Sequence, residues 1–507
     1  MHCSSFLPHA SALRRSVLAL ILIAFTMSFT ALASSSARAQ APSLPDPRTM
    51  RFSTVEFNPP EPDRVVLENG MVVYLLEDHE LPLVTISAFI RTGRWLDPAK
   101  KIGLAGFTGR LMRTGGTQRM TAAEVDEELE HLAAEIGVGF GKTSGSAALD
   151  VLKKDLTRGL RIFADILRTP RFDPERLELA KLQAIEAIRR RHDRPQSIAG
   201  REFPKMIYGP SHPFARESSI ESVSAVTQED LAAFHKQTVH PNGIIMGVTG
   251  DFKKKAMLAL LRATFGDWPR GKVEPIRLPP LDGAGRSSSR VIRFVDKGSS
   301  QTHLRMGHLS LKENDPDYPA LAIVNDILGG SSFRSRLFQD VRTRQGLAYS
   351  VGSGLRPGIW EQGVWLMYAQ TKMESTEQVV KSLIANVDRI RQTPVSDAEL
   401  EEAKEAFVNS FVFSFTSPSR VVNRLMALEY DGLPKDFLQQ LRDKVVALTK
   451  GDLQRAARTH LRADRLMILA VGPGEALPKM LEAFGQVKEI KLKESSADEG
   501  RPTPVSP

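Results

Sequence analysis

Thr227-Gln-Glu-Asp-Leu231, followed by the apolar run Ile244-Ile-Met-Gly-Val248 and a glycine two residues on, returns 222 residues later in the same chain. The second copy consists of Thr449-Lys-Gly-Asp-Leu453 and Leu466-Met-Ile-Leu-Ala470, again with glycine two residues on, and the register holds without a gap. In each copy the acidic residue predicts the first turn of a helix, and the apolar run closed by glycine predicts a strand. This repeat indicates a duplicated structural unit.

A second echo lies upstream of the first. Thr169-Pro170 and Thr393-Pro394 each precede a long amphipathic segment that opens with acidic residues, as suits the N-terminal end of a helix. Two repeated motifs that occur in the same order, at nearly the same separation, are unlikely to be a chance similarity. We therefore predict two homologous domains, the first at residues 55–268 and the second at residues 292–475.

The order of the expected elements gives the fold class. Asn69-Gly70 stands between two apolar runs, which is a strong signal for a tight β-hairpin. Strand pairs are followed by helices and then by a further strand, rather than by alternating strand–helix units. The sequence therefore predicts an α+β fold in which each domain is a mostly antiparallel sheet packed with helices.

Three other segments have the composition of processing signals or connections. Residues 1–39 contain Arg14 and Arg15, then an apolar run and the small-residue pattern Ala37-Arg-Ala39, which together predict a secretory signal cleaved after Ala39. An uncleaved membrane anchor is the alternative, but the run is interrupted by Thr and Ser and is short for a spanning helix. Residues 269–291 are rich in Pro, Gly and Ser and predict a linker, and residues 489–507 predict a disordered tail.

Composition excludes several classes of protein. The chain has 507 residues, 42% hydrophobic and 25% charged, as in an ordinary globular protein, and its net charge of +9 is mild for that length. The single cysteine, Cys3, lies in the predicted signal, so disulfides, thiolate metal ligands and thiol catalysis are not expected. Basic runs occur without interleaved aromatic residues, so no nucleic-acid partner is predicted. Export without disulfides fits the bacterial periplasm, and no transmembrane segment is expected after signal cleavage.

The segment Gly103-Leu-Ala-Gly-Phe-Thr-Gly-Arg-Leu-Met-Arg113 resembles the opening of the insulinase/pitrilysin metallopeptidases, the inverzincins, which include the mitochondrial-processing-peptidase type. The resemblance implies a LuxS/metallohydrolase-like fold whose two domains form half of a clamshell. In that family the corresponding helix carries H-x-x-E-H, in which two histidines hold Zn²⁺ and the glutamate activates the metal-bound water. A glutamate on a later helix is the third protein ligand.

Here the corresponding positions cannot hold the metal. Gly106 and Gly109 have no donor atom, Arg110 is permanently cationic, and the later glutamate falls at Ala187, counting back from Pro195. We therefore expect no metal bound by this chain. One hypothesis is that Arg110 places its charge where zinc would lie and neutralises a nearby carboxylate.

A plain packing role for this helix is the alternative to that hypothesis. Leu104, Phe107 and Leu111 form an apolar face at helical spacing. Each interior glycine costs the helix about 1 kcal/mol relative to alanine, a cost that stability alone would not select.

The most specific match lies in the second half, at Leu328-Gly-Gly-Ser-Ser-Phe-Arg-Ser-Arg-Leu-Phe-Gln-Asp-Val-Arg342 and onward to Tyr349. It resembles the family block whose Arg and Tyr, seven residues apart, reach over the scissile peptide of a facing zinc site. A guanidinium and a phenol can bind peptide carbonyls and stabilise a developing oxyanion. The resemblance implies that Arg342 and Tyr349 act in trans on a partner site.

Structural explanations exist for the same residues. Arg342 falls in the last turn of a helix that Gly346 would cap, where the dipole favours a cation. Tyr349 alternates with Leu347 and Val351 and could be a core residue. The loop formed by Gly329, Gly330 and Ser331 could flank the substrate path, and a turn that needs positive φ would explain its glycines equally well.

The resemblance implies a division of labour between two chains. The leading hypothesis is a zinc-less, non-catalytic subunit that forms a heterodimer with a zinc-bearing homologous subunit and processes extended peptides bound along a sheet edge. An inert scaffold or peptide-binding protein with the same fold is the alternative. A self-sufficient peptidase with a relocated metal is disfavoured. The histidine pairs His235/His240 and His303/His308 are each five residues apart, which is a poor spacing for two ligands on one helix face.

Overall fold

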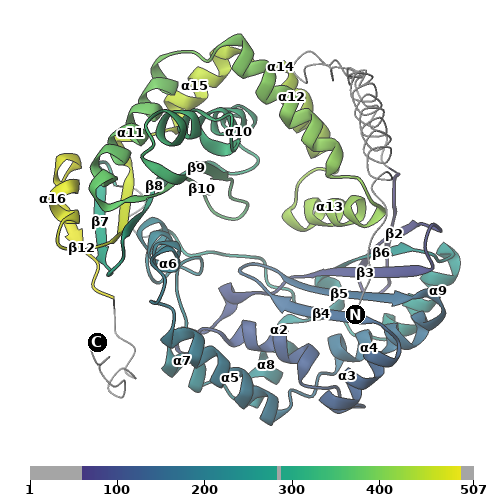
Figure 1. Ribbon diagram of the computed structural model, residues 1–507. Coiled ribbons are helices and arrows are strands. Elements are labelled where there is room, and N and C mark those ends of the chain that lie inside the picture. The colour runs from purple at the N-terminus through teal and green to yellow at the C-terminus, as the bar shows by residue number, and fades with distance from the viewer. Residues whose placement is uncertain (1–59, 282–286, 493–507) are drawn as a thin grey trace, which may run out of the picture. The chain divides into compact units, whose positions relative to one another are not determined.

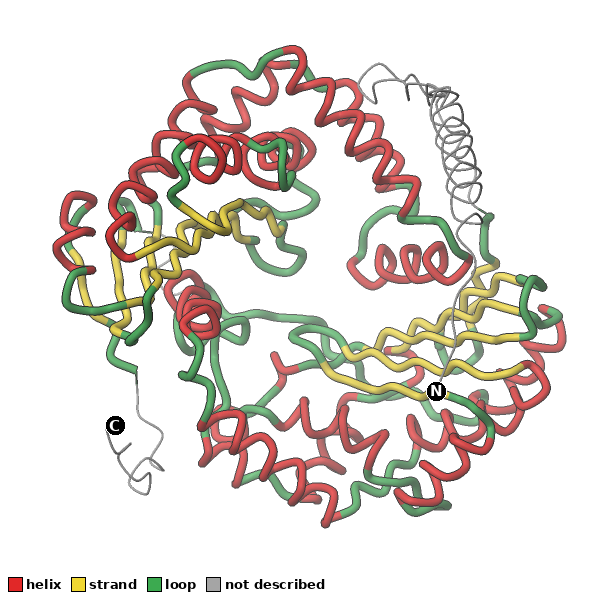
Figure 2. The backbone as a smooth tube through the Cα atoms, viewed as in Figure 1, coloured by secondary structure: helices red, strands yellow, loops and turns green. Residues whose placement is uncertain are grey.

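The computed structural model describes residues 60–281 and 287–492, which belong to one compact unit spanning residues 57–507. Figure 1 shows the helices and strands, and Figure 2 shows the same backbone coloured by secondary structure. The predicted signal at residues 1–39 lies outside the described residues, as does most of the predicted tail. No described helix is long and apolar enough to cross a membrane.

The first repeat builds a six-stranded sheet in the order β1-β2-β6-β3-β5-β4. Its strands are β1 (Asp63–Val66), β2 (Val72–Glu77), β3 (Leu83–Ile90), β4 (Glu135–Phe140), β5 (Gly145–Leu152) and β6 (Ile244–Gly250). The hairpin predicted at Asn69-Gly70 joins β1 to β2, with Gly70 at φ 84°. This positive φ is the conformation that glycine adopts without steric cost.

The second repeat builds a second six-stranded sheet in the order β12-β7-β11-β8-β10-β9. Its strands are β7 (Val291–Asp296), β8 (Gln301–Leu309), β9 (Ala348–Arg356), β10 (Val364–Lys372), β11 (Met467–Gly472) and β12 (Val487–Glu489). The order β2-β6-β3-β5-β4 in the first sheet corresponds to β7-β11-β8-β10-β9 in the second. The two-domain α+β prediction is therefore confirmed.

The sheets are more mixed than we predicted. β2 and β6 run parallel, as do β7 and its two neighbours β11 and β12. Parallel neighbours need a long crossover, and the helices of each repeat supply it between β2 and β6 and between β7 and β11. The second sheet also continues past the predicted boundary at residue 475, since β12 ends at Glu489, where we expected the tail to begin.

Helices of the first repeat are α2 (Leu104–Thr114), α3 (Ala122–His131), α4 (Leu156–Arg168), α5 (Pro174–Arg189), α6 (Pro195–Tyr208), α7 (Ile220–Ser224), α8 (Gln228–Thr238) and α9 (Lys254–Phe265). Those of the second repeat are α10 (Tyr318–Asn325), α11 (Thr376–Gln392), α12 (Asp397–Phe413), α13 (Pro418–Asp431), α14 (Phe437–Ala447), α15 (Lys450–His460) and α16 (Leu477–Leu481). The repeated Thr-x-x-Asp motif is a capping box in both copies: Thr227 caps α8 through Asp230, and Thr449 caps α15 through Asp452.

Each sheet buries one face against helices of its own repeat. In the first sheet the central strands pack against α2, α4, α8 and α9, and in the second they pack against α10, α11 and α15. The opposite faces are covered differently. α13, from the second repeat, packs on the first sheet, and α6, from the first repeat, packs on the second sheet (Figure 1). Each repeat therefore supplies a helix to the other's sheet.

Polar contacts fix α13 on the first sheet. Glu429 of α13 accepts hydrogen bonds from the Arg64 guanidinium at 2.8 and 2.6 Å and from the Tyr74 hydroxyl at 2.5 Å. Arg64 and Tyr74 together hold the pKa of Glu429 below its ordinary range. Beneath the helix, a Cβ atom on Gly247 would lie 2.3 Å from Val422 Cγ1, so glycine permits the close approach of helix and strand.

Candidate functional site

The start of α2 is held by one buried carboxylate. Asp97 accepts backbone hydrogen bonds from Gly103 at 2.8 Å and from Ala105 at 2.7 Å, and its burial raises its pKa. These bonds satisfy N–H groups that the first turn of a helix leaves without partners. The predicted apolar face is confirmed, since Leu104, Phe107 and Leu111 are all buried.

The two interior glycines of α2 differ in their surroundings. A Cβ atom on Gly109 would lie 2.7 Å from the backbone nitrogen of Phe140 in β4, whereas one on Gly106 would meet nothing within 4 Å. Helix–strand packing therefore explains Gly109, and our expectation that packing explains neither glycine is wrong for that position. Packing offers no explanation for Gly106.

Arg110 and Ala187 are both exposed, on α2 and α5 respectively. The Arg110 guanidinium donates a hydrogen bond to the side-chain carbonyl of Gln183 on α5. Within residues 60–281 and 287–492 no carboxylate pairs with Arg110, so the proposed charge neutralisation is wrong. Gly106, Gly109, Arg110 and Ala187 offer no ligand atom for zinc, and the family's metal does not fit these side chains.

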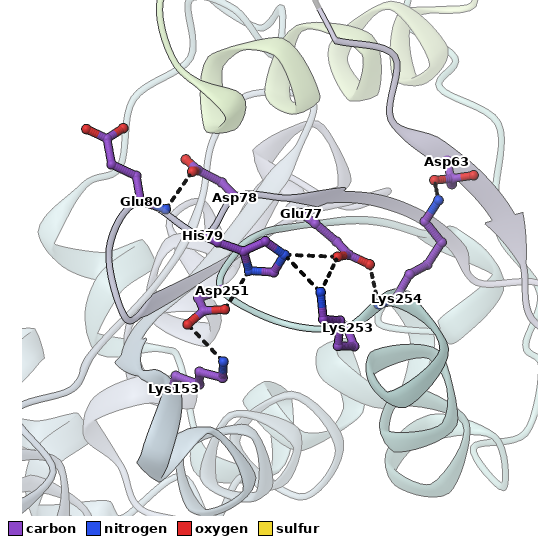
Figure 3. A network of polar contacts seen from close by, with 9 residues as sticks. All are labelled: Asp63, Glu77, Asp78, His79, Glu80, Lys153, Asp251, Lys253 and Lys254. Atoms are coloured by element: carbon purple, nitrogen blue, oxygen red, sulfur yellow. Dashed lines mark hydrogen bonds and ion pairs between the residues drawn. The ribbon is translucent and has the colours of Figure 1, made fainter.

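Two further clusters of acidic residues and histidine among the described residues could be considered as metal sites, but both also contain cationic side chains. Among the described residues one group has candidate ligand atoms close together, namely Asp315, Asp317 and His460. Its Asp317 already accepts from Arg455 at 2.7 Å and pairs with His460 at 2.8 Å. A second cluster, shown in Figure 3, joins residues near the ends of β2 and β6: Asp63, Glu77, His79, Lys153, Asp251, Lys253 and Lys254. Its carboxylates are paired with lysine, as in an ordinary surface network.

In the second repeat, the segment with Arg342 and Tyr349 combines two irregular elements. Arg342 lies in a π-helical turn, Phe338–Arg344, and Gly346 follows with φ 64°. The turn leads into β9, an edge strand of the second sheet. Gln370 of β10 pairs with Ser350 and Thr371 pairs with Ala348, so Tyr349 is the extra residue of a β-bulge.

The bulge directs Tyr349 away from the core. Tyr349 is 75% exposed, while Ala348 and Val351 are buried, so the alternative of a core tyrosine is wrong. The Arg342 guanidinium lies 5.4 Å from the centre of the Tyr349 ring. Arg342 forms no ion pair with any carboxylate in the described part of the chain. The structure therefore brings the two predicted residues together at the surface.

Two neighbouring aromatic residues were missed by sequence reasoning. The Arg342 guanidinium lies 4.7 Å from the centre of the Phe338 ring, and Phe338 packs edge-to-face against Phe333, with ring centres 5.1 Å apart. Phe333 is 70% exposed. Both phenylalanines lie in the segment from Leu328 to Tyr349, close in sequence to Arg342, and this proximity could have predicted the aromatic cluster. The cluster offers donors beside an apolar surface, which suits a peptide backbone.

The predicted Gly-Gly-Ser loop is helical. Gly329 and Gly330 end a π-helical turn, Asp326–Gly330, which Ser331 closes with hydrogen bonds to the Asp326 carbonyl. Neither glycine has a positive φ, so that explanation is wrong. A Cβ atom on Gly329 would lie 2.6 Å from the Ser353 nitrogen, so glycine lets this turn pack closely on β9.

An ion pair anchors the same block. Arg336 donates two hydrogen bonds to Glu399 of α12, at 2.7 and 2.9 Å, in the bidentate geometry that strengthens such pairs. The Arg336 guanidinium lowers the pKa of Glu399 to about 2. The segment from Asp326 to Tyr349 is thus attached to α12 through Arg336, while Arg342 and Tyr349 remain at the surface.

Residues 72–209 match the family model described as Insulinase (Peptidase family M16), and residues 225–407 match the model described as Peptidase M16 inactive domain. The fold and these matches show that the chain belongs to the insulinase family of peptidases. Within that family it is a member whose α2 lacks the zinc-binding side chains.

Curated relatives include an uncharacterized zinc protease of Mycobacterium tuberculosis, 25% identical over 430 residues, which cover 83% of this chain and 96% of that protein. A non-peptidase homologue from Helicobacter pylori is 23% identical over 401 residues, covering 78% and 90%. Among solved structures, a peptidase M16 inactive domain from Pseudomonas fluorescens aligns with a TM-score of 0.73 and 25% identity, covering 81% of this chain and 98% of that one.

Replacement of the two α2 glycines by alanine is expected to have opposite effects. Gly106→Ala should raise the free energy of unfolding by about 1 kcal/mol, because alanine favours the helix and meets no neighbour. Gly109→Ala should lower it by about 1 to 3 kcal/mol, because the new methyl group overlaps the β4 backbone. Urea denaturation measures both, and a Gly109→Ala variant at least as stable as the parent would contradict the packing explanation.

The Arg336–Glu399 pair is expected to stabilise the protein in a pH-dependent way. Because the pKa of Glu399 falls from 4.5 to about 2 on folding, its contribution is complete above about pH 4.5 and is lost as the pH falls towards 2. Glu399→Gln should cost about 1 to 2 kcal/mol at pH 7, allowing for partial exposure. The difference in free energy of unfolding between this variant and the parent should become smaller below about pH 4.5. Denaturation at several pH values tests this, with Glu401→Gln as an exposed control; a gap independent of pH would refute it.

Proposed function

We propose that this chain is the zinc-less subunit of a heterodimeric zinc peptidase. In this proposal it pairs with a zinc-bearing homologous subunit and supplies Arg342 and Tyr349 to that subunit's active site. The observation that carries the proposal is the exposed arrangement of the two side chains, with the guanidinium 5.4 Å from the phenol ring. It is supported by membership of a peptidase family and by metal positions that hold no ligand atom.

The chemistry of the pair suits peptide hydrolysis in trans. A tetrahedral intermediate carries its new negative charge on the former carbonyl oxygen, and preorganised donors stabilise it. A guanidinium contributes a fixed charge with several N–H donors, and a phenol contributes one O–H donor. The same side chains do little for folding, since an exposed cation–π contact contributes only about 0.5 to 1 kcal/mol. Their placement is better explained by an external ligand than by stability.

Edge strands give extended peptides a place to bind. β4 ends the first sheet and β9 ends the second, and an edge strand can pair with the backbone of an added chain. Along β4, Cβ atoms on Gly137 or Gly139 would meet nothing within 4 Å, so the sheet face on which these glycines lie is open at this edge strand. We propose that peptide substrates are held mainly through their backbones, with little dependence on sequence.

The predicted signal at residues 1–39 and the lack of cysteine after Cys3 support export to the bacterial periplasm as the site of this activity. Zinc is expected in the partner and not in this chain. A second candidate function is an inert scaffold or peptide-binding protein. It is favoured by the Gly109 contact, which leaves no room for the family's catalytic glutamate, and by the description of the Helicobacter relative as a non-peptidase homologue.

Co-expression with a zinc-bearing homologue tests the proposal. The lone chain should contain no stoichiometric zinc and should hydrolyse no peptide. The pair should contain zinc and should hydrolyse peptides. Arg342→Ala should lower kcat of the pair by about 100-fold or more, and Tyr349→Phe should lower it by a smaller factor, because each removes an oxyanion donor. Arg344→Ala, on the same turn, is the matched control and should leave kcat unchanged.

The alternatives give different results in the same assays. Zinc and activity in the lone chain would refute the zinc-less assignment. A stable pair that is inactive with every peptide would favour the scaffold. Full activity of an Arg342→Ala pair, with unchanged thermal unfolding of the subunit, would refute the role in trans.

A further inference from the structure

A cavity of about 490 Å³ lies within the first repeat, beside the degenerate metal position. Gly103 at the start of α2 and Ala187 on α5 both line it, and α6 contributes a further wall. Its volume lies in the range of small-molecule and short-peptide sites. None of the residues assigned to the proposed action in trans belongs to it.

Cations outnumber carboxylates in the lining of this cavity. The cationic members are Arg94, Lys142, Arg191, Arg201 and Arg216, and the carboxylates are Asp97 and Glu217. Both carboxylates have other partners: Asp97 accepts the backbone N–H groups of α2, and Glu217 pairs with Arg201 and with Lys205, each at 2.9 Å.

Among the described residues only Arg201 of these five cations forms an ion pair with a carboxylate. The other four, Arg94, Lys142, Arg191 and Arg216, lack one. Lys142 donates to the Phe214 carbonyl at 3.3 Å, and Arg191 donates to the Ser218 carbonyl at 3.1 Å. Carbonyl oxygens orient these side chains but do not neutralise them. An uncompensated positive charge in a cavity favours binding of an anion.

Hydrogen-bonding capacity is also unused at the cavity wall. Arg191 Nε, Arg201 Nη2 and Arg216 Nε are buried and have no acceptor within the described structure. Buried donors without partners cost free energy, and native proteins seldom leave several together. Burial lowers the pKa of Arg201 and of Arg216, although Glu217 opposes the shift for Arg201 and Asp97 opposes it for Arg216. The cluster therefore has more positive charge than negative charge, and several of its N–H donors have no acceptor.

Apart from Ser218, the rest of the lining is formed by apolar residues and glycine. It includes the side chains of Ile102, Ile188, Pro204, Pro213 and Phe214. A site for a bare inorganic ion would be polar throughout, whereas this wall combines cations with hydrocarbon. It matches an anion that carries an apolar group, as the last residue of a peptide does.

We propose that this cavity binds the C-terminal end of a peptide, with the terminal carboxylate at Arg94, Lys142 and Arg191 and an apolar last side chain against Phe214 and Ile188. The inference rests on the proposed function in one respect only, that the ligands of this chain are peptides. It requires neither the partner subunit nor zinc, and it gives the chain a preference for free chain ends over chain interiors.

Isothermal titration calorimetry on the full-length exported chain, without partner, tests the proposal. The probe is an N-acetylated tetrapeptide with no acidic side chain that ends in leucine, compared with its C-terminal amide. The free acid should bind at least tenfold more tightly than the amide, and salt should reduce the difference. Arg94→Gln combined with Lys142→Gln should abolish the preference, whereas Arg110→Gln, on α2 but outside the cavity, should retain it.

Equal affinity for acid and amide would overturn the proposal, as would an acid preference that survives the double substitution in a variant with unchanged thermal unfolding. Inorganic phosphate serves as a competitor. If it displaces the peptide, and if replacing the terminal leucine by glycine has no effect, the site binds anions only and the peptide assignment fails. The binding experiment uses the lone chain, so a negative result would refute the cavity proposal without testing the pairing or the role of Arg342. Conversely, an inactive pair would not affect the measured peptide affinity of the lone chain.

Discussion

The rest of the structure depends on the exchange of α6 and α13 between the two repeats. The central strands β6 and β11 are buried along nearly their whole length, which requires cover on both faces of each sheet. One face is covered by the repeat's own helices and the other by the exchanged helix. Such strands appear in the sequence as continuous apolar runs rather than alternating ones. Neither sheet is complete without its helix from the other repeat, which explains why the described residues form one compact unit.

This frame explains how the metal ligands can be absent without loss of the fold. Arg110 and Ala187 are exposed, and a Cβ atom on Gly106 would meet no neighbour. The packing that holds α2 runs through its buried apolar face and through Asp97. Gly109 is different, because it sets how closely α2 approaches β4. A glutamate there would have to displace the β4 backbone. The absence of the metal site is therefore built into the packing, and substituting the ligands alone would not restore it.

Sequence reasoning succeeded where the signal is local. The Asn69-Gly70 hairpin, the repeated helix starts at Thr227 and Thr449 and the apolar face of α2 all depend on neighbours within a few residues. It failed where distant contacts decide. The bulge at Tyr349 is defined by pairing with β10, and the need for glycine at Gly109 is defined by a strand about 30 residues away. Periodicity offered a core position for Tyr349 as an alternative because it assumes a regular strand, and a single extra residue in the strand excludes that alternative.

The block from Asp326 to Tyr349 has two layers with separate physical explanations. Its lower layer is accounted for by folding: Gly329 packs on β9, and Arg336 is fixed to Glu399 by two short hydrogen bonds. Its upper layer, Phe333, Arg342 and Tyr349, is exposed and gains little from its contacts within the chain. The Arg342 guanidinium lies near the half-buried Phe338 ring and the exposed Tyr349 ring, and this arrangement leaves N–H donors and an apolar surface available to a ligand. The contacts of the lower layer fix the segment that carries those groups. Under the proposed function, such preorganisation would make the donors effective towards a transition state.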